Sequence, residues 1–255
     1  MLPAERMSAV AFAAKNCALE SMTISGAAMQ AARDYESGRI HLDEFVTACS
    51  PSDTAHADPR NTPNIQDLGD AVFARTVLFA ARPASGGGLG ELRSIHGTLF
   101  GGVRADAGSI RTHDTTSSAS AGGIGASPAA FFPAALLETG ATNIASELAE
   151  ARDLKCLDRP VFVTKLAHFY DELGYLHPFS YGNAMTLRIF ASRLAHSAGW
   201  DLDWGPVTRD RYRDAKLRAY NGDLSGFAGM FDAITRPANP TRVFLIAGWD
   251  QGPAH

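Results

Sequence analysis

Cysteine, net charge and long apolar runs are all scarce in this sequence, and each scarcity narrows what the protein can be. The three cysteines are odd in number and far apart, which argues against a disulfide framework or a cysteine metal site and favours a reducing cytoplasm. A net charge of −4 provides no positive surface for nucleic acid or an anionic membrane, so we expect neither as a partner. No apolar run approaches the ~20 residues that a membrane-spanning helix needs.

The sequence has no strong secretion signal at its start. Residues 7–14 are apolar and follow Arg6, as in the centre of a signal peptide. The stretch is short, however, and Lys15 and Asn16 stand where a cleavage site would need small residues. We therefore expect a helix of a cytoplasmic protein here, with secretion by a route that needs no such signal as the alternative.

The chain does contain enough apolar sequence for a full core, arranged in a repeated helical pattern. Among its 255 residues, 45% are hydrophobic and 20% are charged, as in an ordinary globular protein. Apolar residues recur at the spacing of amphipathic helices in much of the chain, and residues 200–204 alternate apolar and acidic side chains, as a short extended segment would. The expected helices are 8–19, 27–36, 41–49, 65–81, 89–100, 134–151, 160–176, 186–198, 208–220 and 225–234.

Composition divides the chain into four parts. Residues 51–64 are rich in Pro, Ser, Asp and Asn and lack apolar periodicity, which predicts a linker. It would join a helical segment at 1–50 to the main core at 65–240. Residues 241–255 form a C-terminal tail to which we assign no function. Taken alone, segment 1–50 is typical of a small packing appendage of three helices.

The chemistry of the sequence concentrates in the loop His-Pro-Phe-Ser-Tyr-Gly-Asn-Ala-Met-Thr-Leu-Arg, which runs from 177 to 188 between two apolar helices. Pro178 and Gly182 interrupt the helical pattern, and the second helix follows directly. A helix N-terminus presents unpaired N–H groups and a partial positive charge, so small residues there can hold phosphate. His177 precedes this cradle, and Arg188 follows it about a turn and a half into the helix.

This loop resembles the signature of the Fic family, which reads His-Pro-Phe-x-Asp/Glu-Gly-Asn-Gly-Arg-x-x-Arg. The positions that agree are His177, Phe179, Gly182, Asn183 and Arg188. The stretch 92–111 also resembles the early core helix of the family and the start of its flap. The resemblance implies an all-α fold, with a Fic-type helical core and a short β-hairpin flap. It also implies transfer of AMP from ATP onto a hydroxyl of a target protein.

The resemblance also implies a role for each matching residue. His177 is the expected general base, since an imidazole with its usual pKa of about 6.5 is largely neutral at pH 7. Phe179 is the expected apolar anchor of the loop. The ordinary alternatives are a hydrogen-bonded structural histidine at 177 and a helix-surface ion pair at 188. The residues expected to bind the phosphates of ATP are Gly182, Asn183, Ala184 and Arg188.

Three positions of the signature differ in this chain. Tyr181 replaces the acidic residue that binds Mg²⁺ in the family, Ala184 replaces a glycine, and Met185 replaces the first arginine. Tyrosine is a poor Mg²⁺ ligand and methionine carries no charge, so we expect weakened or altered transfer and a Mg²⁺ ion without its usual ligand. Groups nearby in sequence that could compensate are Lys165, His168 and Asp171.

The N-terminal segment resembles an inhibitory helix that some Fic proteins or their partner antitoxins carry, with the pattern Ser/Thr-x-x-x-Glu-Gly/Asn. The chain matches it at Ser21 and Gly26, with Ser25 in place of the glutamate. The resemblance implies that residues 1–50 are an antitoxin-like segment fused in cis. A serine cannot make the charge-assisted, two-pronged contact of a carboxylate with Arg188, so we expect weakened inhibition.

The leading hypothesis is a bacterial toxin- or effector-like Fic adenylyltransferase, cytoplasmic or secreted, that modifies Ser, Thr or Tyr of a target protein. Its flap, expected within 111–133, would bind the target by strand addition, although a plain surface loop fits this glycine-rich stretch equally well. Two alternatives stay open. One is a transferase that uses another nucleotide or a phosphocholine-type donor, and the other is a catalytically silent Fic fold that serves as a binding or regulatory module.

Overall fold

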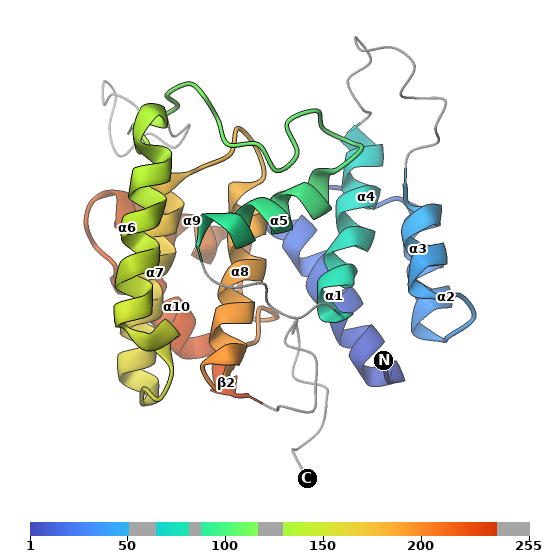
Figure 1. Cartoon of the computed structure of the whole chain (residues 1–255). Helices are drawn as coiled ribbons and strands as arrows, with labels where there is room; N and C mark the ends of the chain where they lie inside the picture. The colour runs from blue at the N-terminus through green and yellow to red at the C-terminus, as the bar shows by residue number, and fades with distance from the viewer. Residues whose placement is uncertain (51–64, 82–87, 117–129, 239–255) are drawn as a thin grey trace.

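Ten α-helices and one pair of short strands make up the part of the chain that the computed structural model describes, residues 1–50, 65–81, 88–116 and 130–238 (Figure 1). The strands β1 (Trp200–Leu202) and β2 (Thr235–Pro237) pair antiparallel. The all-α prediction is confirmed. The helices are α1 (Pro3–Leu19), α2 (Gly26–Glu36), α3 (Leu42–Ala48), α4 (Ile65–Leu78), α5 (Leu89–Phe100), α6 (Leu137–Glu150), α7 (Arg159–Leu176), α8 (Asn183–Ser197), α9 (Arg209–Tyr220) and α10 (Ser225–Ile234).

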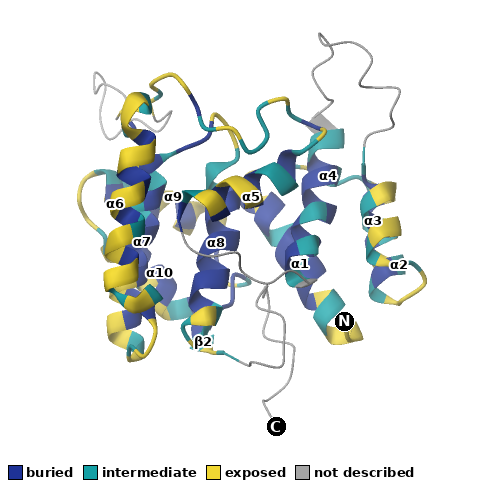
Figure 2. Ribbon diagram, viewed as in Figure 1, coloured by how far each residue is buried: buried dark blue, intermediate teal, exposed yellow. Residues whose placement is uncertain are grey.

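Helix α8 lies at the centre of the fold. Every residue from Met185 to Ala195 is buried, and Figure 2 shows the helix in dark blue along most of its length. Helices α1, α5 and α7 all contact it, and Figure 1 shows α6 and α7 on one side of it and α1 and α4 on the other. A helix buried on every face cannot shift without disturbing several neighbours. The loop that leads into α8 is therefore attached to a rigid centre.

The ends of α7 and α8 shape the loop between them. The carboxylate of Asp158 caps α7 by accepting a hydrogen bond from the Val161 N–H at 3.0 Å. The same helix ends at His177, whose φ of 45° is left-handed. Gly182 precedes α8 with a φ of 71°, and a Cβ at this position would overlap the ring of Phe100. Only glycine meets both demands, so residue 182 fixes where the cradle begins.

The base of the predicted flap is closed by an isolated antiparallel bridge between Thr116 and Ala130. Next to it, the Phe131 N–H donates to the carbonyl of Thr115 at 3.1 Å. The two ends of this segment are thus joined where they leave the helical core. Residues 117–129, the linker predicted at 51–64 and the tail predicted at 241–255 lie outside the described residues.

The N-terminal helices share the main hydrophobic core. Helix α1 packs against α4 and also contacts α8 and α9. The rings of Tyr35 and Phe45 stack 5.4 Å apart between α2 and α3, and Phe45 meets Phe73 of α4. The carbonyl of Thr23 lies so close to Gly69 of α4 that a Cβ on that glycine would overlap it. The turn between α1 and α2 is therefore seated directly on α4.

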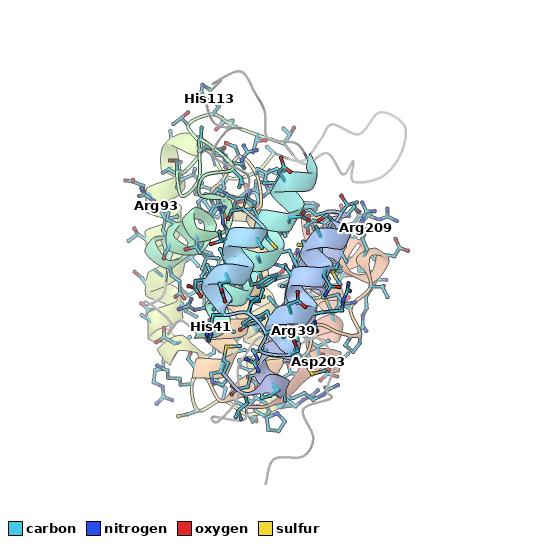
Figure 3. All side chains as sticks on the ribbon, turned by 90° about the vertical axis from the view of Figure 1, so that its right-hand side faces the viewer. Arg39, His41, Arg93, His113, Asp203 and Arg209 are labelled. Atoms are coloured by element: carbon cyan, nitrogen blue, oxygen red, sulfur yellow. The ribbon has the colours of Figure 1, made fainter. Side chains whose placement is uncertain are left out.

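Figure 3 views the molecule from the side of these N-terminal helices. His113, near the flap base, lies at the opposite end of the molecule from Arg39 and His41 in the turn between α2 and α3. Arg209, the first residue of α9, lies beside α1 in this view, and Lys15 of α1 donates to the carbonyl of Val207 at 3.0 Å. Among the described helices, none has the length and hydropathy to cross a membrane.

Candidate active site

His177 ends α7 with its ring against the base of the flap. The imidazole stacks on the ring of Phe131, with centroids 3.7 Å apart and planes 11° apart. Burial, followed by the positive charges of Lys216 and Arg111, lowers the pKa of His177 to about 4. At neutral pH the imidazole is therefore uncharged and keeps a lone pair, which is the state that a general base requires.

Arg111 holds the backbone around His177. Its side chain is buried, and its guanidinium donates hydrogen bonds to four backbone carbonyls of the described residues. Its own N–H also donates to the carbonyl of Pro178 at 2.9 Å. These bonds join the flap base to the end of α7 and stabilise the left-handed conformation of His177. The accepting carbonyls belong to His113, Phe132, Leu176 and, at 2.7 Å from Nε, His177.

His96 of α5 holds the other half of the loop. The Gly108 N–H donates to Nδ1 of His96 at 2.8 Å, so the ring proton is on Nε2, which donates to the carbonyl of Tyr181 at 3.0 Å. Burial lowers the pKa of His96, in keeping with a neutral ring. The ring also stacks on the buried Phe179 with centroids 4.0 Å apart. Sequence analysis did not single out His96, although it lies in the stretch that resembles the family's early core helix.

The N-terminus of α8 provides the backbone donors of the predicted cradle. The first intrahelical bond runs from the Thr186 N–H to the carbonyl of Gly182 at 3.1 Å, so the N–H groups before it have no partner within the helix. Ala184 lies inside α8, where a methyl group is tolerated. The side chain of Asn183 instead bonds both backbone groups of Phe179, at 2.9 and 2.7 Å. That amide therefore shapes the loop, and the anion donors are main-chain groups.

His177 and the start of α8 line one cavity. Helices α7, α8, α9 and α10 all contribute to its walls, which are rich in tyrosine. The lining residues include Tyr170, Asp171, Tyr175, His177, Asn183, Ala184, Tyr212, Lys216, Tyr220 and Phe227.

Arg188 is held by α1 and is not among the residues that line this cavity. Its side chain is only 1% exposed. Nε donates to Oδ1 of Asn16 at 2.6 Å, Nη2 donates to the carbonyl of Asn16 at 3.1 Å, and Nη1 pairs with Oε1 of Glu20 at 2.9 Å. The guanidinium also lies 5.0 Å from the centre of the Tyr212 ring. The phosphate contact predicted for Arg188 therefore requires its release from α1.

The alignment that placed Ser25 at the glutamate position of the inhibitory pattern is wrong, because the carboxylate that pairs with Arg188 is that of Glu20. Ser25 caps α2, where its hydroxyl accepts a hydrogen bond from the Ala28 N–H at 3.0 Å. Its backbone N–H donates to Asp70 at 2.7 Å. A carboxylate thus reaches Arg188 after all, and the expectation that a serine replaces it does not hold.

The other two residues predicted for the inhibitory segment, Ser21 and Gly26, also lie away from this contact. Ser21 has a φ of 58° in the turn after α1, and Gly26 is the first residue of α2. The residues that do meet Arg188, Asn16 and Glu20, are four apart and share one face of α1. This spacing is the one that the inhibitory pattern has, five residues earlier than predicted. The asparagine in place of its serine or threonine concealed the match.

The side chains at 181 and 185 do not fit a Mg²⁺ ion held by the protein. Met185 is buried and uncharged. The ring of Tyr181 lies 4.8 Å from the guanidinium of Arg104, which pairs with both carboxylate oxygens of Asp106 at 2.8 Å. A cation beside a phenol repels a second cation, and Mg²⁺ prefers carboxylates and water. Within the described ranges, no cluster of three or more His, Cys, Asp or Glu offers an alternative site.

Of the three nearby groups considered as compensation, one lines the cavity. Asp171 contributes to its wall, and burial raises the pKa of its carboxyl group. His168 pairs with Glu147 at 2.9 Å near the surface, and Lys165 is exposed. Neither of these two is among the residues that line the cavity.

Sequence comparison places the centre of the chain in one family. The sequence model of the Fic/DOC family matches residues 88–195. The probable protein adenylyltransferase Fic of Escherichia coli K12 is 32% identical over 185 residues, which cover 70% of this chain and 88% of that protein. The protein adenylyltransferase VbhT of Bartonella schoenbuchensis is 33% identical over 135 residues, or 53% of this chain and 26% of that longer protein.

Solved structures show the same fold. The N-terminal Fic domain of a Bartonella quintana effector protein, solved with bound ADP, has a TM-score of 0.59 at 23% identity and covers 72% of this chain and 90% of that one. The BepC protein of Bartonella tribocorum, solved with bound AMPPNP, has a TM-score of 0.59 at 22% identity over 68% and 86% of the two chains. With its helical architecture and the relatives above, the chain belongs to the Fic/DOC family.

Proposed function

We propose that the protein is a Fic-type protein adenylyltransferase, a bacterial toxin- or effector-like enzyme that transfers AMP from ATP to a Ser, Thr or Tyr hydroxyl of a target protein. The observation that carries the proposal is the shared cavity, in which a neutral His177 and the N-terminus of α8 face the same space. The names of the relatives support it, since they are protein adenylyltransferases. The nucleotides bound in the two solved relatives support an adenine nucleotide as the ligand.

The reaction needs a base and a phosphate cradle. His177 takes the proton of the target hydroxyl, whose oxygen attacks the α-phosphorus of ATP. The bond from the α-phosphorus to the bridging oxygen of pyrophosphate breaks, and pyrophosphate leaves with that electron pair. The N–H groups that open α8 stabilise the charge on the transferred phosphate. Arg111 and His96 act as positioning residues, because they hold the loop that carries both parts.

The same residues predict a slow enzyme. Met185 supplies no positive charge, and the pairing of Arg188 with α1 keeps a second one away from the cavity. Tyr181 and its cationic neighbour do not fit Mg²⁺, so these residues do not add the ion's stabilisation of the phosphates. Each ~1.4 kcal/mol of lost transition-state stabilisation costs a factor of ten in rate.

The N-terminal segment fits the role of an antitoxin-like inhibitor in cis. Glu20 and Asn16 fill the hydrogen-bonding positions of Arg188 that phosphate oxygens would otherwise occupy. The contact is charge-assisted and buried on the arginine side, and such contacts are about twice as strong as neutral ones. In this proposal Asn16 and Glu20 take the places of the serine or threonine and the glutamate of the inhibitory pattern.

The test is labelling of proteins by α-labelled ATP, with the full chain added to a bacterial lysate. Wild type should label at least one protein band, and His177→Ala should lose this labelling by a factor of about 10² or more. His168→Ala, which removes a surface histidine of the same helix, should label as wild type does. Equal labelling by wild type and His177→Ala would refute the proposed base.

Parallel reactions separate the alternatives. Labelled UTP, GTP and CDP-choline test another phosphate-linked donor, and a signal with one of these alone would identify it. A catalytically silent module would give no His177-dependent labelling with any donor, even after Glu20→Ala releases Arg188.

A further inference from the structure

Lys216 of α9 is a cation that the loop chemistry described above does not use. It lies one turn after Tyr212, is half-buried, and lines the cavity together with His177, Asn183 and Ala184. Its ammonium group lies against the ring of Tyr220, at 5.9 Å from Nζ to the centroid. Among the described residues, no hydrogen bond or ion pair joins its ammonium group to a partner. By comparison, Lys15 donates to a carbonyl at 3.0 Å.

A half-buried ammonium group without a counter-ion is costly, and the cavity offers little to neutralise it. Burial lowers the pKa of Lys216, while the charge of Glu20 acts in the opposite direction. Glu20 is already paired with Arg188. Burial raises the pKa of Asp171, the carboxyl group on the cavity wall, and among the described residues no ion pair joins it to Lys216. Lys216 therefore lies in the same cavity as a helix N-terminus without an ion-pair partner of its own.

An anion is the ligand that such a cavity favours. The first residues of α8, whose N–H groups have no partner within the helix, and Lys216 line one cavity. Tyrosine rings form much of the remaining wall, which suits an aromatic or sugar portion attached to the anion. Both features match a nucleotide with a free phosphate chain.

We propose that Lys216 binds the phosphates of the nucleotide donor and supplies the positive charge that Met185 lacks. This inference rests on the proposed function and adds a residue from outside the signature loop. A lysine reaches a phosphate as a point charge on a flexible stem, so it can act from α9 without a fixed fork. Arg188 would add a second cation only after α1 releases it.

Binding of ATP and of adenosine to the full chain, measured by isothermal titration calorimetry, tests the inference. Lys216→Gln should weaken ATP binding about tenfold or more and leave adenosine binding unchanged, because only ATP carries phosphates. Lys216→Arg should retain most of the ATP affinity. The matched control is Arg213→Gln on the same helix, where a side chain 72% exposed to solvent is removed, and it should bind both ligands as wild type does.

An equal ATP affinity in wild type and Lys216→Gln would overturn the inference while leaving the proposed function intact. An equal loss of ATP and adenosine binding would also overturn it, because it would show that Lys216 shapes the pocket and does not contact phosphate. If the wild-type protein neither binds ATP nor labels any protein, the proposed function is refuted, and the inference with it.

A second measurement does not depend on binding. Lys216→Gln should raise the pKa of His177 above its value of about 4, since Lys216 is one of the charges that lower it. An NMR titration of the His177 ring reads this directly. An unchanged value would show that Lys216 is not close to the base.

Discussion

Two buried arginines hold the site, and they do so by different means. Arg111 bonds only carbonyls of the backbone, from the flap base and the end of α7. Arg188 depends on Asn16 and Glu20, which belong to a helix more than 160 positions earlier in the chain. Arg111 therefore can leave its partners only if the local fold opens, whereas Arg188 can exchange its partners for a ligand. Arg111 thus stabilises the conformation of the site, whereas Arg188 has partners that a ligand could replace.

The largest effect is expected from removing Arg111, which tests whether this arginine is structural. Arg111→Met keeps the length of the side chain but leaves several buried carbonyls without donors, each at a cost of about 1–3 kcal/mol. We expect the free energy of unfolding to fall by about 3 kcal/mol or more, measured by urea denaturation. Labelling should be lost with it. A variant as stable as wild type would show that water or another donor replaces the guanidinium.

The second prediction concerns the contact of Arg188 with α1. Glu20→Gln keeps the shape and removes the charge, which costs roughly 1 kcal/mol of a charge-assisted bond. We expect the labelling rate to rise about fivefold, and to rise further in Glu20→Ala. Glu147→Gln, which alters an exposed carboxylate on α6, is the control. A fall in labelling on Glu20→Gln would mean that α1 supports the active state.

The third prediction concerns His96, which joins Gly108 to Tyr181 of the loop, as Arg111 joins the segment 111–113 to His177. Its two ring nitrogens have separate partners, so Asn at 96 can mimic Nδ1 and Gln can mimic Nε2. Each replacement loses one hydrogen bond and the stacking on Phe179, for an expected cost of about 1–2 kcal/mol. Urea denaturation measures this loss. A fall in kcat at unchanged KM would show that the loop, rather than nucleotide binding, is affected.

The smallest expected effect is the pH dependence of stability due to His177. The folded-state pKa is about 4, below the usual value of about 6.5 in an unfolded chain. As the pH falls through this window, the unfolded state takes up the proton first, so the free energy of unfolding decreases. Above about pH 6.5 this contribution is absent. His177→Gln should show a smaller slope over the window in urea denaturation at stepped pH, and an identical slope would contradict the pKa.

The sequence was informative wherever the cause of a structure is local. The expected helical stretches correspond to the ten α-helices that the structure describes, and Gly182 with Pro178 marked the loop between α7 and α8. The apolar repeat of α8 begins at Thr186, and the expectation that the small residues after Pro178 open the helix agrees with its start at Asn183. The loop residues that form the candidate site were likewise found from their order in one short stretch.

Contacts between distant segments were not predictable in this way. The partner of Arg188 comes from α1, and nothing in the spacing of residues 177–188 indicates it. Helix α9 carries many charged residues, yet Tyr212, Ala215 and Ala219 are buried and Lys216 lines the cavity. Only the packing of α9 against α1 and α10 decides which of its charges meets solvent.

The close contact between the carbonyl of Thr23 and Gly69 links the position of Glu20 to helix α4, far from the candidate site. A single methyl group at position 69 would push the turn after α1 away from α4, and Glu20 is three residues from that carbonyl. We expect this displacement to move the end of α1, and Glu20 with it, while the residues of the candidate site stay chemically unchanged. Substitutions at position 69 of α4 could therefore tune the proposed inhibitory pairing of Glu20 with Arg188 from outside the nucleotide site.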